Sequence, residues 1–416
     1  MRILIVNFFY SPSSEAHSHR WTELAEFWAK RGKSVEVLTG SYEGKPRFQI
    51  QNKVKVTRVG FPKWRSFNYD KESIVKYPPN KLFSLLRYLY TKLRWPDSFW
   101  YWCPFAIFEI SKRFRCKYDL VISYYPSFSA HIAVLFLKIF SKNNSFKWVL
   151  DYGDPFSTLE SMPPNNFYLY RNLNLYFEKL FADYGQIVFY NDSLVKDYIE
   201  KLSLRKKIIP KKIESLINLE KFYRDDFKSN KIKKSNKIKL NYVGKFYVLF
   251  REPYILFEVI SKLNNISDFS IELDIYGPTG GFDLEQKGNK FINYKGTVDR
   301  DRAIKIMKKS RFLINIENTN CIQSPSKTAE IVATGIPIIN ISNPKNPDYL
   351  LKDYEEIGGC ISISRENIDN DSIKKLIDFI KIKSTKNNIK KNDLIKLLKN
   401  NLIENVSKKY LNLVSN

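Results

Sequence analysis

Residues 312–341, FLINIENTNCIQSPSKTAEIVATGIPIINI, contain a complete strand–helix–strand unit. An apolar run at each end indicates a buried strand, and the segment between them carries helix signals at both of its ends. Ser324 suits the N-cap, Pro325 the first helical position and Gly335 the C-terminal cap, while Pro337 prevents continuation of the helix. Strands that alternate with helices in this way predict a parallel sheet.

The same alternation extends through most of the chain. In the first half, strands are predicted at 3–9, 34–39, 53–59, 119–123, 147–151 and 187–190, and helices at 15–31, 128–140, 167–183 and 193–202. Residues 205–239 are rich in lysine, asparagine and serine and indicate a domain boundary. Beyond them strands are predicted at 238–243, 271–276, 291–295, 312–316 and 337–341, and helices at 253–264, 300–309, 325–334 and 371–416. The sequence therefore predicts an α/β protein with two doubly wound parallel sheets.

The composition limits the broad class of protein. A chain of 416 residues, of which 44% are hydrophobic and 15% aromatic, is too long for one core and too apolar to be mostly disordered. The four cysteines have no metal-ligand spacing, which favours a reducing cytosol. No apolar run reaches the about 18–20 residues that a transmembrane helix needs. The apolar run at the N-terminus is short and is soon followed by charged residues. It therefore fits a buried strand better than a signal peptide.

The formal net charge is +26. A nucleic acid, an anionic membrane surface or a genome biased toward lysine codons would each explain it, and the abundance of asparagine and isoleucine supports the last as a partial cause.

Lys327 lies in the first turn of the helix predicted at 325–334, where the helix dipole disfavours a cation. A bound anion would resolve this, because free backbone N–H groups and the dipole bind phosphate at a helix start. Ser326 would add a hydroxyl, and Glu330, one turn on, would accept hydrogen bonds from sugar hydroxyls. The alternative is a solvated surface helix with no ligand.

A second cluster follows the strand predicted at 238–243. Gly244 allows a ligand to approach the backbone, and Lys245 and Arg251 could clamp a diphosphate. Both clusters lie at carboxyl ends of strands in one sheet, where open α/β sheets bind ligands. Their shared position argues against the alternative that Lys245 and Arg251 are unrelated surface cations.

These residues resemble glycosyltransferase family 4, whose members are retaining enzymes of the GT-B fold. The matching stretches span most of residues 1–340 and keep the order and spacing of the family. They are ILIVNFFYSPSSEAHSHRWTELAEFWAKRGKSVEVLTG, DLVISYYPSFSAHIAVLFLK, VLDYGDPFS, IESLINLEKF, YVGKFYVLFREP, YKGTVDRDRAIKIMKKSRFLINI and SPSKTAEIVATGIPII.

The resemblance implies two Rossmann-like domains that face a central cleft. The N-terminal acceptor-side domain would be 1–215, the linker 216–237, and the donor-binding domain 238–385, with a C-terminal helical segment, 386–416, packing back on the first domain. The donor's diphosphate would meet Gly244, Lys245, Arg251, Ser326 and Lys327. Its ribose would meet Glu330, and its base Thr297 and Val298.

Three positions depart from the family pattern. The first glutamate of the family's E-x7-E motif is replaced by Ile322, which matches a subgroup that commonly lacks it. Ser14-Glu15-Ala16 stands in place of a glycine pair in the first loop, and Gly153 replaces an arginine. The change in the first loop alters how the backbone approaches donor or acceptor, and at Gly153 one polar contact is missing or supplied elsewhere.

The implied reaction is a metal-independent transfer, of the hexosyltransferase type, that retains anomeric configuration. The resemblance implies that the leaving phosphate itself takes the acceptor proton, so the protein would mainly stabilise the leaving group. No cofactor beyond the nucleotide-diphosphate sugar and no metal is expected. The first domain offers Glu15, His17 and Asp151 as candidate catalytic residues. His131, in an apolar helical pattern, fits a core histidine better.

Residues 81–95, KLFSLLRYLYTKLRW, combine a leucine face with flanking cations. Such a helix suits an anionic membrane, although packing onto the sheet of the first domain explains the leucine stripe alone better. Together with the charge and the resemblance, it predicts a cytoplasmic protein, peripheral at the inner face of the membrane. The expected acceptor is a glycan or a polyprenyl-diphosphate-linked sugar in bacterial surface polysaccharide synthesis.

Three rival functions remain. A nucleotide-sugar epimerase of the same fold would need ionisable catalytic groups, of which few are obvious, and a phosphorylase would need a longer chain. A basic nucleic-acid-binding protein would explain the charge, but no recognition module is present and no nucleic acid is expected. The sequence leaves open the donor, the acceptor, the linkage and the oligomeric state.

Overall fold

The computed structural model describes residues 1–13, 15–61, 81–158, 163–202, 209–223, 237–284, 290–319, 327–385 and 388–415. The chain forms two compact units, one of Met1–Glu214 with Val406–Asn416 and one of Ser215–Asn405. The segment expected to be a linker, 216–237, instead contributes its described beginning to the second unit. The C-terminal segment 386–416 is divided, and only Val406 onward belongs to the first unit.

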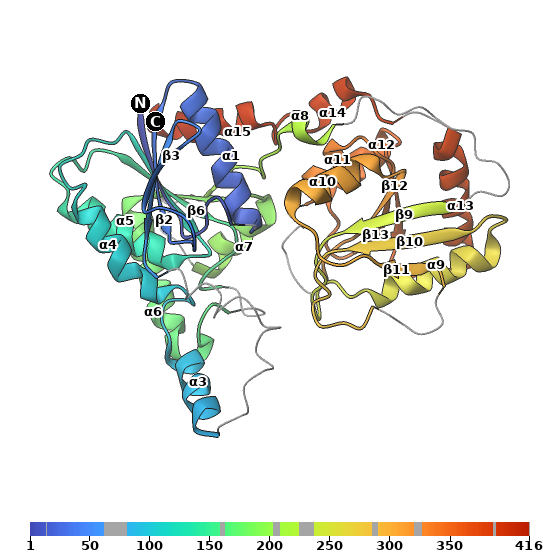
Figure 1. The fold of residues 1–416 in the computed structure, drawn as a ribbon, viewed down its shortest axis with the longest axis horizontal. Coiled ribbons are helices and arrows are strands. Elements are labelled where there is room, and N and C mark those ends of the chain that lie inside the picture. Colours follow the sequence, from blue (N-terminus) through green and yellow to red (C-terminus); the bar gives the residue numbers. More distant parts are fainter. Residues whose placement is uncertain are drawn as a thin grey trace. The chain divides into compact units, whose positions relative to one another are not determined.

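The first unit is built on an eight-stranded sheet (Figure 1). Its spatial order is β3-β4-β2-β1-β5-β6-β7-β8, and every strand pair is parallel except β3 with β4. The strands are β1 (Arg2–Val6), β2 (Ser34–Gly40), β3 (Phe48–Gln51), β4 (Val54–Val59), β5 (Leu120–Tyr125), β6 (Lys147–Tyr152), β7 (Gln186–Phe189) and β8 (Lys211–Lys212). The helices are α1 (Ala16–Lys30), α3 (Lys81–Leu93), η2 (Trp100–Trp102), α4 (Cys103–Ser111), α5 (Phe128–Phe140), α6 (Phe167–Tyr184) and α7 (Asp192–Leu202).

The second unit has a six-stranded sheet with the order β11-β10-β9-β12-β13-β14, and all of its pairs are parallel. The strands are β9 (Ile238–Val243), β10 (Ile271–Tyr276), β11 (Ile292–Tyr294), β12 (Phe312–Ile316), β13 (Ile338–Ser342) and β14 (Cys360–Ser364). The helices are α8 (Leu219–Phe222), α9 (Tyr254–Ile266), α10 (Arg300–Lys309), α11 (Thr328–Ala333), α12 (Tyr349–Glu356), α13 (Asn370–Thr385) and α14 (Lys391–Leu397). The last helix, α15 (Ile403–Ser415), begins in this unit and ends in the first.

Each face of the second sheet is covered by its own hydrophobic core. On one face, α9 and α13 pack leucine and isoleucine side chains against β9, β10 and β12. On the other, α8, α11, α12 and α14 pack around Leu313 and Ile338 (Figure 1). A parallel sheet buried on both faces needs strands that are apolar almost throughout, which is the pattern of β12 and β13. The predicted fold class is confirmed in this respect.

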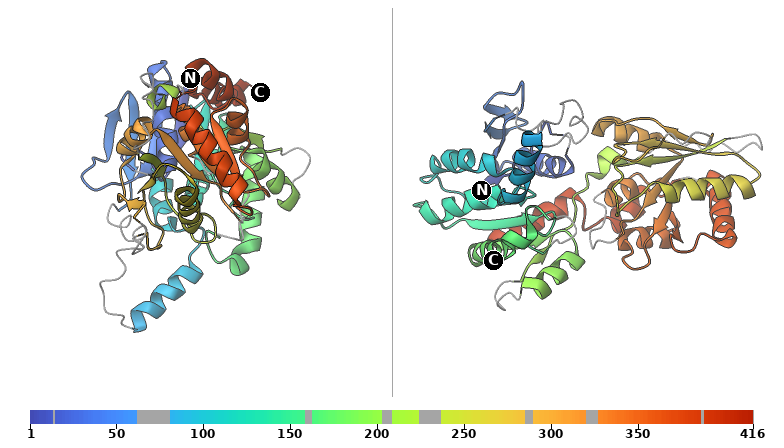
Figure 2. Two further views of the ribbon diagram at one scale, coloured as in Figure 1. Left: turned by 90° about the vertical axis from the view of Figure 1, so that its right-hand side faces the viewer. Right: turned by 90° about the horizontal axis from the view of Figure 1, so that it is seen from below.

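The C-terminal helix α15 packs on the first unit. Helix α15 returns to α1, where the indole nitrogen of Trp28 donates a 2.7 Å hydrogen bond to Ser407 and the ring of Tyr410 lies 5.6 Å from that of Trp21. Both termini therefore lie in this unit (Figures 1 and 2). Helix α3 extends outward from the rest of the unit in both figures.

Several elements differ from the sequence prediction, among them β14, α8 and α12, where no strand or helix was predicted. The short strand β3 was not predicted, because it is an edge strand whose apolar residues Phe48 and Ile50 face solvent at 61% and 73% exposure. Helix α11 begins at Thr328 rather than Pro325. Ser324 to Ser326 lie outside the described residues.

Candidate functional site

The carboxyl end of β9 and the start of α11 meet through Lys327. Its ammonium group donates a 3.3 Å hydrogen bond to the carbonyl of Val243 and lies 4.2 Å from the centre of the Tyr242 ring. Gly244 makes this approach possible, since a Cβ at that position would lie only 2.6 Å from Nζ of Lys327. Gly244 and Lys327, predicted separately from two segments of sequence, thus occupy one place in the structure.

Two further glycines bring neighbouring loops against the same backbone. Gly277, which follows β10, has φ of +130°, and a Cβ there would lie 2.3 Å from the carbonyl oxygen of Gly244. The N–H of Gly277 donates to the carbonyl of Gly296 at 3.0 Å. A Cβ at Gly280 would similarly lie 2.4 Å from the carbonyl oxygen of Phe246. The sequence analysis did not single out Gly277 or Gly280, although a glycine-rich turn directly after a strand was the available signal.

Arg251 is buried beside this group. Its Nη2 donates to Oδ1 of Asn318 at 2.6 Å, and its Nη1 to the carbonyl of Lys245 at 3.5 Å. Asn318 follows β12, and the N–H of its neighbour Thr319 donates to the carbonyl of Phe250 at 2.9 Å. The segment after β12 therefore fixes the segment after β9, and with it the guanidinium of Arg251.

A chain of buried polar groups stands behind Asn318. Its carbonyl accepts from the side chain of Asn343 at 2.8 Å, and the N–H of Asn343 donates to Glu317 at 2.8 Å. The other carboxylate oxygen of Glu317 accepts from Asn340 at 2.7 Å. Burial raises the pKa of Glu317 above its usual value, while these hydrogen bonds oppose the shift. The arrangement holds the carboxyl edge of β12 and β13 in one geometry.

The electrostatics of Lys327 are those of a cation that lacks an anion. Desolvation lowers its pKa well below the ordinary value, the nearby charge of Arg251 lowers it further, and Glu330 partly opposes both effects. The described residues place no carboxylate within salt-bridge distance of Nζ. Two cations held close together, one of them desolvated, form a favourable site for a polyanion such as a diphosphate.

The other residues predicted to contact the donor's diphosphate and base are less buried than Arg251 where the structure describes them. Lys245 is exposed, with its Nζ 5.1 Å from the centre of the Tyr247 ring. Thr297 is exposed and Val298 half-buried, in the loop that follows Gly296. Because Gly296 is hydrogen-bonded to Gly277, this loop lies beside the glycine-bounded backbone. Ser326 lies outside the described residues.

Glu330 has a partner that the sequence did not indicate. Its carboxylate forms a 2.7 Å salt bridge with Nη2 of Arg300, at the start of α10. The guanidinium of Arg300 also lies 5.7 Å from the centre of the Phe222 ring. A ribose that binds Glu330 would therefore use a carboxylate that is already oriented by a cation.

The candidate residues of the first unit are not gathered at one described point. Asp151 is buried at the end of β6, accepts a hydrogen bond from the hydroxyl of Tyr410 and lies 3.7 Å from the guanidinium of Arg20. Burial raises the pKa of Asp151. These partners favour a role in docking α15 over a catalytic one. Glu15 precedes α1, and His17 lies in its first turn, but the side chain of His17 is outside the described part of the structure.

Two other ionisable groups of the first unit are buried. Burial lowers the pKa of His131 to about 3, and its Nδ1 lies 2.6 Å from Oγ of Ser123, as suits a neutral core histidine. Burial raises the pKa of Asp154, two residues after β6, to about 6. Within the described ranges, no three histidine, cysteine or acidic side chains gather as a metal site.

The sequence matches no family model and no curated protein. Solved structures do match over the whole chain. Sucrose-phosphate synthase from Thermosynechococcus elongatus matches with a TM-score of 0.63 at 13% identity, covering 100% of this chain and 98% of that one. A trehalose-phosphate synthase from Burkholderia xenovorans, solved with glucose-6-phosphate, matches with a TM-score of 0.61 at 8% identity and complete coverage of both chains.

The catalytic domain of starch synthase IV from Arabidopsis thaliana, bound to ADP and acarbose, matches with a TM-score of 0.59 at 9% identity, covering 100% of this chain and 98% of that one. At such identities the likeness concerns the fold and not the activity. Two parallel-sheet α/β units in this chain order, matched along their whole length by these proteins, establish that the chain has the GT-B fold.

Proposed function

We propose that the protein is a glycosyltransferase that moves a sugar from a nucleotide-diphosphate sugar to a hydroxyl of an acceptor. The observation that carries this proposal is the meeting of Lys327 and Arg251 beside the side-chain-free backbone of Gly244. It supplies a desolvated cation, a buried guanidinium and close backbone access at the carboxyl end of a parallel sheet, the edge at which such folds bind nucleotides. The solved GT-B proteins include one bound to ADP, which supports the same choice.

The proposed reaction retains anomeric configuration and uses no metal. The acceptor hydroxyl attacks the anomeric carbon on the face from which the diphosphate departs, a new C–O bond replaces the sugar–phosphate bond, and a leaving phosphate oxygen takes the hydroxyl proton. Negative charge grows on the diphosphate as the bond breaks. Lys327 and Arg251 would stabilise this charge, which lowers the barrier because both are in place before the reaction begins.

The proposed acceptor is a glycan or lipid-linked sugar of a bacterial surface polysaccharide, reached at the membrane surface. Helix α3 supports this part, because its described side chains include the exposed Leu89 and Leu93 together with the exposed Lys92. No helix of the described residues is long and apolar enough to cross a membrane. The proposed contact is therefore peripheral and depends on anionic lipid.

A thermal-shift panel of UDP, GDP, ADP and CDP tests the donor site. We expect one of these nucleotides to raise the melting temperature by about 5–10 °C at about a hundredfold excess over its Kd, because only the native state binds it. Lys327→Ala should abolish this shift. Lys309→Ala, which removes an exposed lysine on α10 of the same unit, is the matched control and should retain it.

The panel can also contradict the proposal. If no nucleotide shifts the folded protein, or if Lys327→Ala binds as well as the wild type, the donor site is not where we place it. Salt-sensitive binding of DNA in the absence of any nucleotide effect would favour a nucleic-acid-binding function instead.

A further inference from the structure

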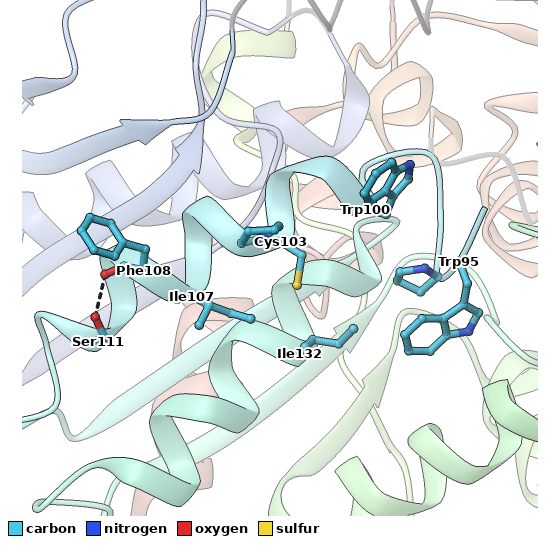
Figure 3. A pocket seen from close by; sticks show the side chains of 9 residues that line it. Trp95, Trp100, Cys103, Ile107, Phe108, Ser111 and Ile132 are labelled. Carbon is cyan, nitrogen blue, oxygen red and sulfur yellow. Dashed lines mark hydrogen bonds between the residues drawn. The ribbon is translucent and has the colours of Figure 1, made fainter. Parts of the chain in front are cut away.

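The first unit has an apolar groove between α4 and α5 that the proposed sugar transfer does not use. Its volume is about 640 Å³, within the range of ligand pockets. Figure 3 shows its two ends, with Trp95 and Trp100 at one and Phe108 and Ser111 at the other. Cys103 and Ile107 of α4 and Ile132 of α5 lie between them.

The polar atoms that line this groove are already engaged. The indole nitrogen of Trp100 donates to the hydroxyl of Tyr90 at 2.9 Å, and that of Trp95 donates to Asn174 at 3.0 Å. The hydroxyl of Ser111 donates to the carbonyl of Phe108 at 2.8 Å (Figure 3). Burial raises the pKa of the Cys103 thiol to about 12, so it remains a neutral, largely apolar group. An occupant would therefore meet apolar surface and aromatic rings without needing to supply hydrogen bonds.

The surface around the groove is also apolar. Exposed large apolar side chains project from all four neighbouring helices, among them Leu89 and Leu93 on α3, Phe108 on α4, Phe136 and Phe140 on α5, and Tyr176 on α6. Hydrogen bonds from Trp100 to α3 and from Trp95 to α6 tie these helices to the mouth of the groove. Exposed large apolar side chains on all four helices around one apolar groove favour a surface that meets more than water.

The charges on the same helices have one predominant sign. Lys92 and Arg171 are exposed on α3 and α6, and Lys112 is exposed directly after α4. Glu109 is buried and paired with three cations, Glu178 is buried, and Asp183 is the one exposed carboxylate among the described side chains of α3 to α6. A surface that combines exposed aromatic and leucine side chains with cations complements an anionic lipid bilayer.

We propose that this groove seats the hydrocarbon chain of a membrane lipid, and that α3 to α6 form the face that docks on an anionic bilayer. The inference rests on the membrane contact of the proposed function but not on its donor site. Trp95 and Trp100 mark where the chain enters, because their rings line the groove while their N–H groups are satisfied elsewhere. The groove would hold one extended hydrocarbon chain of a lipid, drawn out of the bilayer core.

Vesicles whose phospholipid chains are brominated test this directly, since bromine quenches tryptophan fluorescence only at short range. We expect the protein to bind vesicles of phosphatidylcholine with phosphatidylglycerol and its fluorescence to be quenched. The variant in which Trp95 and Trp100 are both phenylalanine should lose most of the quenching while still binding. Phe108→Asp, at a residue that is 64% exposed, should weaken vesicle binding by about tenfold or more.

Tyr349→Asp is the matched control, because Tyr349 is an aromatic residue of a helix in the other unit and is 70% exposed. It should bind vesicles as the wild type does. Both aspartate variants should keep the nucleotide-induced thermal shift, so loss of vesicle binding is distinguishable from loss of the donor site. Three outcomes would overturn the inference: no vesicle binding, binding without quenching, or a self-associated protein that Phe108→Asp converts to monomer.

Discussion

Lys327 combines two properties that oppose each other in the absence of a ligand. Its position beside Val243 and Tyr242 removes water from the ammonium group, and Arg251 adds a repulsive charge. Both effects destabilise the charged form, and a protein that needed only stability would have an apolar residue there. The residue is explained if an anion regularly occupies the site.

This reasoning predicts that Lys327→Met stabilises the protein without ligand. We expect a rise in melting temperature of about 2–4 °C, equivalent to about 1 kcal/mol, because methionine keeps the packing and removes the desolvated charge. The same variant should show no shift with any nucleoside diphosphate. Differential scanning fluorimetry with and without nucleotide measures both effects. A variant that is destabilised and still binds would show that Lys327 serves the fold.

Asn318 is predicted to act through Arg251. Asn318→Ala removes the 2.6 Å hydrogen bond that orients the guanidinium, and we expect it to weaken nucleoside diphosphate binding by about tenfold, as loss of one charge-assisted hydrogen bond would. Asn318→Asp keeps an acceptor for Arg251 but adds a carboxylate that competes with the diphosphate, so it should also bind weakly. Isothermal titration calorimetry measures the affinities.

The salt dependence of binding separates these two variants. The aspartate variant should lose much of the dependence on salt, because the net positive charge at the site is smaller, whereas the alanine variant should retain it. Wild-type affinity in Asn318→Ala would mean that the fold around Arg251 is sufficient without this contact.

At the scale of elements, the sequence predicted what hydrophobic periodicity determines. The strands from β9 to β13 begin and end within two residues of the predicted ranges. β12 and β13 are apolar almost throughout, as strands buried on both faces are, whereas β9 and β10 alternate apolar with polar residues. Helix α4 was not predicted, because CPFAIFEIS has apolar residues on all sides and no helical period. It packs against α5 and lines the groove between the two helices.

The candidate site was predictable only in part, for a similar reason. Gly244, Arg251 and Lys327 carry local signals, a glycine after a strand or a cation at a helix start, and the structure brings them together. Asn318 and Arg300 carry none, since their roles come from contacts with residues distant in sequence. Asp151 shows the converse, because a polar residue at a strand end suggested a site while its hydrogen-bond partner Tyr410 lies 259 positions away.

The docking of α15 on the first unit can be tested at Asp151. We expect Asp151→Asn and Tyr410→Phe each to lower the free energy of unfolding by about 1–3 kcal/mol. Tyr410→Phe leaves the buried carboxylate without its hydroxyl donor, and Asp151→Asn removes the charge that pairs with Arg20. Nucleotide binding should be unchanged in both. Urea unfolding followed by tyrosine and tryptophan fluorescence measures the loss. Full stability of Asp151→Asn with abolished sugar transfer would instead assign this carboxylate to catalysis.

At the scale of the whole molecule, the two units have separate sheets and separate cores, and the chain connects them at Glu214–Ser215 and again within α15. The donor site described here belongs to the second unit. The proposed lipid groove and the buried carboxyl groups of Asp97 and Glu178 belong to the first. A substitution or ligand that changes the stability of one unit should therefore change the unfolding of that unit more than the unfolding of the other.

The buried acids of the first unit make this separation measurable through pH. Burial raises the pKa of Glu178 to about 8 and that of Asp97 to about 7, against hydrogen bonds that act to lower both. Above the ordinary pKa of a carboxyl group, the unfolded chain has lost these protons while the folded unit still holds them. Stability from each group is therefore complete below about pH 4 and is lost as pH rises through the folded pKa.

We therefore expect calorimetry to resolve two transitions that respond to different variables. Between pH 5 and pH 7 the free energy of unfolding of the first unit should fall as pH rises, and its transition temperature with it. Glu178 alone should contribute up to about 1.4 kcal/mol per pH unit, and Glu178→Gln should remove that contribution. The nucleotide that binds should raise the transition temperature of the second unit and leave that of the first unit unchanged. Because Glu178→Gln retains the shape of the side chain and cannot ionise, it separates titration from packing. A single transition that both pH and nucleotide move together would show that the two units unfold as one.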